Sequence, residues 1–161
     1  MKRFFLMSLA LVATLVAGAQ DEVLQKYTEM GDVNTTYVSK GMLEQVSLDQ
    51  FNVPGLQDMV SHIEAMTILV SRGDKAGKEM GNKLPKQLMG KGFEERYSGD
   101  QPDPSDPEGK KRIHVRMLQS KKDPSRVVMV MYKKPQATVV SMRGDFGTVP
   151  VHLLLPEKVH Y

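Results

Sequence analysis

The chain has 161 residues, with 22 lysines and arginines, 19 aspartates and glutamates, and no cysteine. Without cysteine, disulfides, thiolate metal sites and cysteine nucleophiles are excluded, so the fold depends on its core alone. Apart from the N-terminal run described next, no stretch is long and apolar enough to suggest a membrane-spanning helix.

The first 19 residues have the three parts of a cleavable secretory signal peptide. Lys2 and Arg3 form a positively charged end, residues 4–16 form an apolar run, and Ala17 and Ala19 offer small side chains to a signal peptidase. An uncleaved membrane anchor is the alternative, but the run has about 13 residues whereas a spanning helix needs roughly 20. We therefore expect cleavage after Ala19.

The mature chain, residues 20–161, is expected to form a single α+β domain that is periplasmic or secreted. No cysteine follows the apolar run, so a thioether-linked lipid anchor is excluded and we expect no stable membrane anchor. Because Lys2 and Arg3 are lost with the signal peptide, 20 basic residues remain against 19 acidic ones. Nucleic-acid binding requires clustered positive charge, so we expect no nucleic-acid partner.

The mature chain begins with a helical pattern. Apolar residues at helical spacing predict a helix over residues 21–30, with Asp21 placed to cap it. β-branched and aromatic residues predict a strand over 34–39. The pattern over 42–51 is mixed, and Pro54-Gly55 is a turn.

Two further helices are predicted before the chain becomes strand-rich. The first covers residues 56–63 and is followed by a compact apolar run over 66–71 that suits a buried strand. The second covers residues 74–89, with Asp74 as its cap. Pro85 lies inside this helix and predicts a kink, because proline has no N–H to donate.

The second half of the mature chain predicts four strands. They cover residues 93–97, 112–119, 126–133 and 137–143. Short connections between strands favour antiparallel neighbours. The loop over 99–109 contains three prolines and is predicted to be irregular. For 149–155, an apolar stretch between two prolines, both strand and short helix stay open.

This order of elements predicts an α+β fold in which a largely antiparallel sheet of about five or six strands packs on about three helices as a two-layer sandwich. Over residues 127–132 both alternating sets of side chains are apolar, whereas a strand covered on one face would alternate apolar and polar residues. Either helices and the C-terminal segment cover the second face, or this face binds a protein partner or a second copy.

Two groups of residues are candidate metal ligands. The four histidines lack the close spacing of a zinc site: His62, His114, His152 and His160. Four acidic residues share one segment and offer oxygen ligands to calcium: Asp100, Asp103, Asp106 and Glu108. Prolines interrupt the spacing that a calcium loop needs, so a solvated linker is the favoured interpretation and no metal is assigned.

Short motifs give no catalytic assignment. The glycines of residues 73–78 have the wrong spacing for a phosphate loop. Two Arg-Gly-Asp tripeptides, at 72–74 and 143–145, are interpreted as turns at strand ends. Glu94 and Glu95 fall on opposite faces of a strand, and no serine-nucleophile motif is present.

Methionine is unusually frequent, with 12 residues in the chain. Met129 and Met131 share one strand face, and Met117 and Met142 are on strands that are expected to flank it. Thioethers bind copper(I), but methionine more often fills an irregular core. Core packing is therefore favoured, and no cofactor is assigned.

Several segments resemble a family of small exported bacterial proteins catalogued as domain of unknown function 4252. The segments are residues 27–31 (Tyr-Thr-Glu-Met-Gly), 37–42 (Tyr-Val-Ser-Lys-Gly-Met), 66–71, 92–95 (Gly-Phe-Glu-Glu) and 139–146 (Val-Val-Ser-Met-Arg-Gly-Asp-Phe). The resemblance covers most of the mature chain and implies an α+β envelope protein. It supplies no catalytic or binding residues. Many relatives resemble lipoproteins, whereas this chain lacks the required cysteine.

Two hypotheses about function follow. The first is a non-catalytic exported module of the bacterial envelope that binds a protein, a peptide or a surface polymer. The second is a small periplasmic hydrolase or ligand-binding enzyme whose residues are scattered in the sequence and gathered by the fold. The lack of catalytic motifs favours the first, and no catalytic, cofactor-binding or metal-binding residue is assigned.

Overall fold

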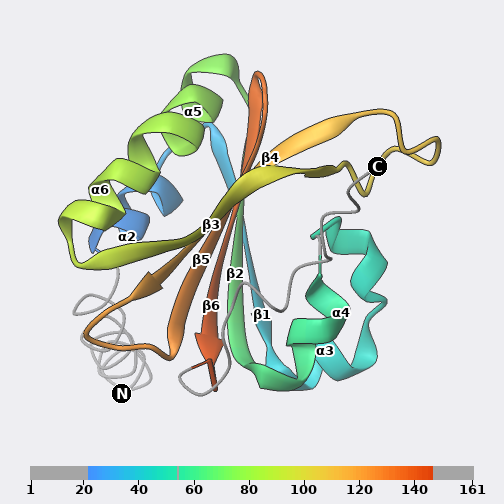
Figure 1. Ribbon diagram of the computed structural model, residues 1–161, viewed down its shortest axis with the longest axis vertical. Coiled ribbons are helices and arrows are strands. Elements are labelled where there is room, and N and C mark those ends of the chain that lie inside the picture. Colours follow the sequence, from blue (N-terminus) through green and yellow to red (C-terminus); the bar gives the residue numbers. More distant parts are fainter. Residues whose placement is uncertain (1–21, 54, 147–161) are drawn as a thin grey trace, which may run out of the picture.

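The structure, a computed structural model, describes residues 22–53 and 55–146 (Figure 1). In chain order its elements are α2 (Glu22–Thr28), β1 (Val33–Ser39), α3 (Lys40–Gln45), the 3₁₀ turn η1 (Leu48–Phe51), α4 (Leu56–Met59), the 3₁₀ turn η2 (Val60–His62), β2 (Ile63–Ser71), α5 (Asp74–Lys78), the π turn η3 (Glu79–Lys83), α6 (Leu84–Gly90), β3 (Phe93–Pro102), β4 (Arg112–Ser120), β5 (Arg126–Lys133) and β6 (Gln136–Gly144). The predicted signal peptide, the cap at Asp21 and the undecided segment 149–155 lie outside the described residues.

The strands form one six-stranded sheet in the order β1-β2-β6-β5-β4-β3, and every neighbouring pair is antiparallel. The predicted α+β sandwich with a largely antiparallel sheet is therefore confirmed. The last strand of the described chain, β6, lies in the middle of the sheet between β2 and β5. The two edges of the sheet are β1 and β3.

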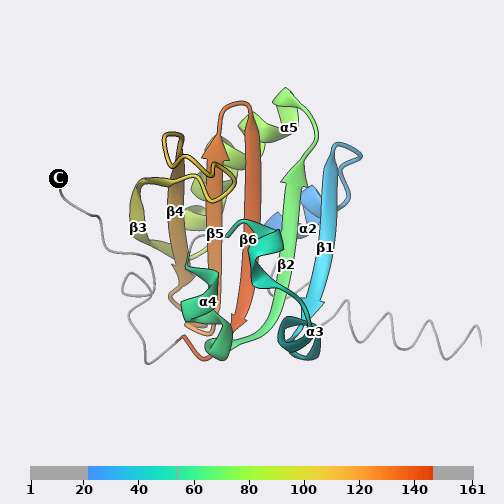
Figure 2. The same cartoon turned by 90° about the vertical axis from the view of Figure 1, so that its right-hand side faces the viewer.

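Helices cover both faces of the sheet, as Figures 1 and 2 show. On one side, here called the α6 face, α2, α5, η3 and α6 pack on Leu69, Val128 and Val139. On the other, the α4 face, α3, η1 and α4 pack on Met66 and Met129. The sheet is thus the middle of three layers, and the predicted two-layer arrangement was wrong. The segment from α3 to η2, in which the sequence pattern was mixed over 42–51, forms a second helical cover.

This double cover explains the apolar strand β5. Val128 and Val130 belong to the core of the α6 face, whereas Val127, Met129 and Met131 belong to the core of the α4 face. All five side chains are buried. The helices of this chain therefore account for both apolar sets of β5.

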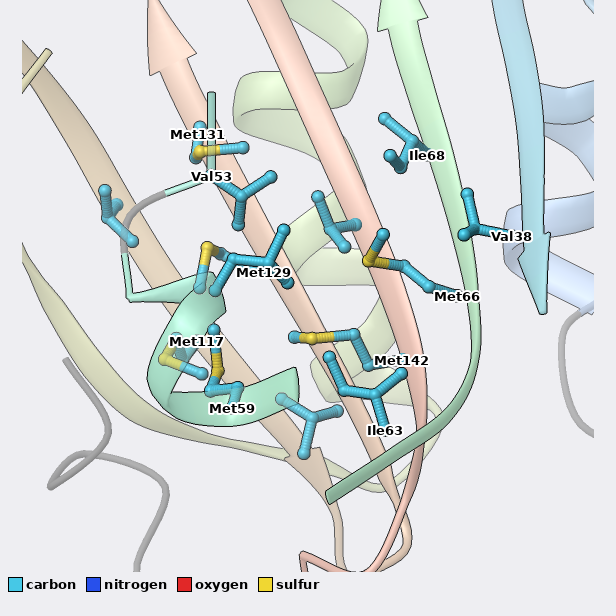
Figure 3. Packing of buried hydrophobic residues seen from close by; sticks show 14 of the residues in the cluster. Val38, Val53, Met59, Ile63, Met66, Ile68, Met117, Met129, Met131 and Met142 are labelled. Atoms are coloured by element: carbon cyan, nitrogen blue, oxygen red, sulfur yellow. The ribbon is translucent and has the colours of Figure 1, made fainter. Parts of the chain in front are cut away.

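The core of the α4 face is rich in methionine (Figure 3). Six of its buried residues are Met59, Met66, Met117, Met129, Met131 and Met142. In the sheet Met117 lies opposite Met129, and Met66 lies opposite Met142. The prediction that Met117 and Met142 are on strands that flank the strand of Met129 is confirmed, since β4 and β6 lie on either side of β5. Flexible thioether side chains fill the space between the sheet and the short helix α4, as methionine does in irregular cores.

The predicted third helix is one continuous helical segment from Asp74 to Gly90, and its middle is a π turn. The N–H of Leu84 bonds to the carbonyl of Glu79, five residues back, directly before Pro85. The wider turn accommodates a proline that cannot donate an N–H, which accounts for the predicted irregularity. The predicted cap was wrong, because Gly73 is the N-cap and no side chain bonds there.

This helical segment approaches the sheet closely at two glycines. A Cβ atom on Gly77 would lie 1.8 Å from the carbonyl oxygen of Pro135, and one on Gly81 would lie 2.6 Å from the ring of Tyr132. Larger side chains at either position would push the helix away from β5 and β6.

In the described residues no helix is long and apolar enough to cross a membrane.

Two strands, β2 and β3, extend by three or more residues beyond their predicted bounds. Residues 99–102, predicted as loop, belong to β3, because Gly99 to Pro102 continue the pairing with β4. Ile63, predicted as helix, begins β2 and pairs with Gly144. In both places cross-strand pairing overrides the local sequence signal.

Candidate functional site

A cleft of about 300 Å³ opens on the α4 face, where β5 ends and β6 begins. It lies between η1, the sheet and the loop over 103–111 that joins β3 to β4, here called the β3–β4 loop. Its apolar lining is Phe51, Val70, Ile113 and Met131, and its polar lining includes Gln50, Asn52, Asp103, Ser105, Lys133, Gln136 and Thr138. An apolar lining with polar groups around it is typical of ligand sites.

One wall of the cleft is fixed by Asp103. Its side chain is 6% exposed and accepts hydrogen bonds from Lys133 Nζ at 2.7 Å and from the Ser105 hydroxyl at 2.6 Å. The Asp103 N–H donates to the carbonyl of Lys111. The hydrogen bond from Lys133, followed by that from Ser105, lowers the pKa of Asp103 to about 2. An Asp103 that is ionised at neutral pH therefore ties the loop to the end of β5.

The rest of the β3–β4 loop is ordered around Asp106. This carboxylate accepts the backbone N–H groups of Glu108, Lys110 and Lys111, with distances of 3.1, 2.8 and 2.7 Å. The hydrogen bond from the Lys111 N–H is the main cause that lowers the pKa of Asp106. Pro104 and Pro107 thus lie in a loop held by side-chain to backbone bonds, whereas Pro102 ends β3.

The opposite wall of the cleft comes from η1 and the residue after it. Asn52 has a φ of +51°, a left-handed conformation that asparagine tolerates better than most residues. This turn directs the chain into the buried Val53 and leaves Gln50 and Asn52 exposed at the rim. The rim of the cleft is thereby supplied with side-chain amides.

The four acidic residues considered as calcium ligands are kept apart. Asp100 contacts His114, Asp103 contacts Lys133, and Glu108 pairs with Lys110. Asp106 is occupied by backbone N–H groups. In the part of the chain that the structure describes, no group of three or more His, Cys, Asp or Glu side chains is arranged around a common point for a metal ion.

A second candidate lies on β3 and β4. The ring of His114 contacts Asp100 Oδ1 through Nδ1 at 3.0 Å and Ser98 Oγ through Nε2 at 3.2 Å. Asp100 is directly opposite His114 in the sheet, and Ser98 is two residues back on the same face. Serine, histidine and aspartate thus follow each other in the order of a hydrolase triad. The His114 and Asp100 side chains are 42% and 65% exposed.

Sequence reasoning missed this group because its members are far apart in the chain and no local motif marks them. The one usable signal was the pairing of β3 with β4, which required β3 to continue through the Gly99 and Pro102 positions. His62 is not part of the group, since it lies at the other end of the sheet beside Phe146, with 6.5 Å between the ring centres. His152 and His160 lie outside the described residues.

The remaining motifs have structural roles. Residues 73–78 are the N-cap and the whole of α5, in which Gly77 packs on the turn between β5 and β6. In the tripeptide at 143–145, Gly144 is buried, and a Cβ there would lie 1.7 Å from the carbonyl oxygen of His62. Glu95 forms an ion pair with Arg116.

Comparison with protein-family models, with curated proteins and with solved structures finds no match.

Proposed function

We propose that the protein is a non-catalytic exported module that binds a peptide segment in the cleft between η1 and the β3–β4 loop. The single observation that carries this proposal is the composition of the cleft. Side-chain amides of Gln50, Asn52 and Gln136 surround an apolar lining that includes Ile113 and Met131. Each amide offers both a donor and an acceptor, which matches the alternating groups of a peptide backbone.

The size and charge of the cleft favour a short peptide segment. A volume of about 300 Å³ accommodates one or two apolar side chains, at the lower limit of ligand sites. Lys133, 43% exposed, is already paired with Asp103, so the cleft offers no isolated charge for a strongly charged ligand. An uncharged segment with an apolar anchor side chain fits this combination best.

Binding of peptides from a displayed random library to the mature protein tests this proposal. The double variant Gln50→Ala/Gln136→Ala should weaken binding of the selected peptides about tenfold, because both amides are lost from the rim. Gln57→Ala removes an exposed amide from α4 outside the cleft and should leave binding unchanged. Selected peptides that bind the double variant as tightly as the parent protein would refute the proposal.

The location is a separate part of the proposal. The signal-like first 19 residues and the resemblance to a family of exported bacterial proteins both support the envelope, and membership in that family stays a prediction. Fractionation of a bacterial host that produces the full chain should recover a soluble periplasmic or secreted form. Mass spectrometry should find Gln20 at its N-terminus. A cytoplasmic protein that still begins at Met1 would contradict this location.

The second candidate function is a serine hydrolase. It is favoured by one observation, the contacts of His114 with Ser98 and Asp100. His114 would take the Ser98 proton while Oγ attacks an acyl carbon, and Asp100 would orient the imidazole. It ranks second because the exposed Asp100 carboxylate is screened by water, which weakens its support of a charged imidazole.

Hydrolysis of p-nitrophenyl acetate distinguishes this candidate. If the triad is active, Ser98→Ala and His114→Gln should each reduce the rate to that of the uncatalysed reaction, whereas Ser61→Ala, at an exposed position on η2, should not. Equal rates for all three variants and the parent protein would reject a hydrolase at this site.

A further inference from the structure

The two edges of the sheet differ in how they are protected against pairing. β3 has four charged residues, Glu94, Glu95, Arg96 and Asp100, an irregular register after Glu95, and a proline at its end. Charges, bulges and proline are the features that keep edge strands from pairing with other chains. β1 has none of them, since its seven residues are uncharged and pair with β2 without a register shift.

The outer strand β1 is also accessible (Figure 2). Thr36 in its centre is exposed, and Tyr37 is 67% exposed, the largest value among the exposed large hydrophobic side chains of the described chain. Met42, at the start of α3, is 48% exposed. The edge that lacks protection thus carries exposed apolar side chains, a combination typical of a pairing surface.

The charges that flank β1 indicate which strand can pair with its free edge. Asp32 precedes the strand and Lys40 follows it, and each lies four residues from Thr36. If two copies of β1 pair antiparallel about Thr36, Asp32 of each copy lies at the same end of the pair as Lys40 of the other. Tyr37 of each copy then faces Thr35 of the other. No like charges meet at the axis, because the residues between Asp32 and Lys40 are uncharged.

We propose that β1 is a dimerisation edge, at which a second copy of this chain adds its β1 antiparallel and joins the two sheets into one. Backbone hydrogen bonds between the two edge strands supply the attraction, and the Asp32–Lys40 pairs set the register. A second copy is favoured over an unrelated peptide because its β1 has the reversed charges at the required positions. No residue of β1 lines the peptide cleft on the α4 face, so this inference does not depend on the proposed function.

Single cysteines test the two-fold axis, since the chain contains no other cysteine. In Thr36→Cys the two Cα atoms would be about 4.5–5.5 Å apart across the axis, which is within the range of a disulfide. In Asn34→Cys, on the same face, the two cysteines would be offset by four residues, about 13 Å along the strand. In a glutathione buffer Thr36→Cys should form a covalent dimer and Asn34→Cys should stay monomeric. Equal yields from both variants, or no dimer from Thr36→Cys, would overturn the proposal.

Charge exchange tests the register independently. Asp32→Lys and Lys40→Asp should each raise the dimer dissociation constant, measured by sedimentation equilibrium, by about tenfold or more, because like charges then meet at both ends. The double variant should restore dimerisation. Gln57→Lys adds a positive charge on α4 and should have no effect, and circular dichroism should show that every variant is folded. A parent protein that stays monomeric, or a double variant no better than the single ones, would refute the two-fold pairing.

Discussion

Lys133 Nζ donates a hydrogen bond to Asp103 Oδ2 over 2.7 Å, and this contact joins two parts of the chain that are 30 residues apart. The pKa of Asp103 is lowered from 3.8 to about 2, so the folded protein stabilises the ionised carboxylate more than the unfolded chain does. The contribution to stability is therefore complete above about pH 4 and is lost as the pH falls toward 2.

Asp103→Asn should lower the free energy of unfolding at neutral pH by at most about 2 kcal/mol, and by less where solvent screens the exposed Lys133. The difference from the parent protein should be small near pH 2, where about half of the Asp103 carboxyls of the folded state are protonated, and should disappear below that pH. Urea unfolding followed by circular dichroism at the two pH values measures this. Asp58→Asn, at an exposed position on α4, is the control. A difference that stays constant with pH would show that the Asp103 charge does not stabilise the loop.

Gly77→Ala should destabilise the protein by about 3 kcal/mol or more, because a Cβ atom would overlap the carbonyl of Pro135 and neither backbone can yield easily. Gly90→Ala is the matched control, since a Cβ at this exposed end of α6 meets nothing within 4 Å. Thermal unfolding of the two variants should give a large decrease for the first and little change for the second. Similar melting temperatures would mean that α5 does not pack on the turn between β5 and β6.

Thr35→Val should stabilise the protein by about 1 kcal/mol. The Thr35 hydroxyl is the one buried side-chain N or O atom without a hydrogen-bond partner among the described residues, and valine replaces it with a methyl group of similar shape. Thr35→Ser retains the hydroxyl and should give no gain. Chemical unfolding at protein concentrations that keep the chain monomeric measures both. A loss of stability in the valine variant would indicate that the hydroxyl has a partner after all.

Met129→Ala should cost about 3 kcal/mol, because it leaves a cavity between the sheet and α4 where the side chain is fully buried. The same substitution at Met89, which is 37% exposed on α6, should cost much less. Equilibrium unfolding compares the two variants. Equal costs would contradict a tightly packed methionine core.

The sequence predicted best those elements in which the buried positions are occupied by apolar residues. The predicted bounds of β5, 126–133, agree with the structure because six of its eight residues are buried, with branched or thioether side chains on both faces. The prediction was poorer for α3, where Gly41 and Met42 obscure the helical pattern. Its N-cap, Ser39, accepts the Met42 N–H at 3.3 Å and was a usable signal.

The candidate sites were less predictable for a different reason. The Asp103–Lys133 contact and the group of Ser98, His114 and Asp100 both depend on how β3 extends beyond Tyr97, where Gly99 and Pro102 favour a loop when considered locally. Only the hydrogen bonds to β4 make these residues a strand, and those bonds join positions that periodicity does not connect. A one-residue shift in this pairing would place His114 away from both partners.

The central position of β6 also fixes the order in which the chain can complete its fold. A chain that ends at Lys133 contains the β1–β2 pair and the three strands β3 to β5. In such a chain β2 and β5 lack the neighbour that they share in the complete sheet. Residues 136–144 supply that neighbour and, with it, the contacts between the two halves. During synthesis from the N-terminus, closure of the sheet is therefore a late event, because β2 and β5 have no shared neighbour until residues 136–144 arrive.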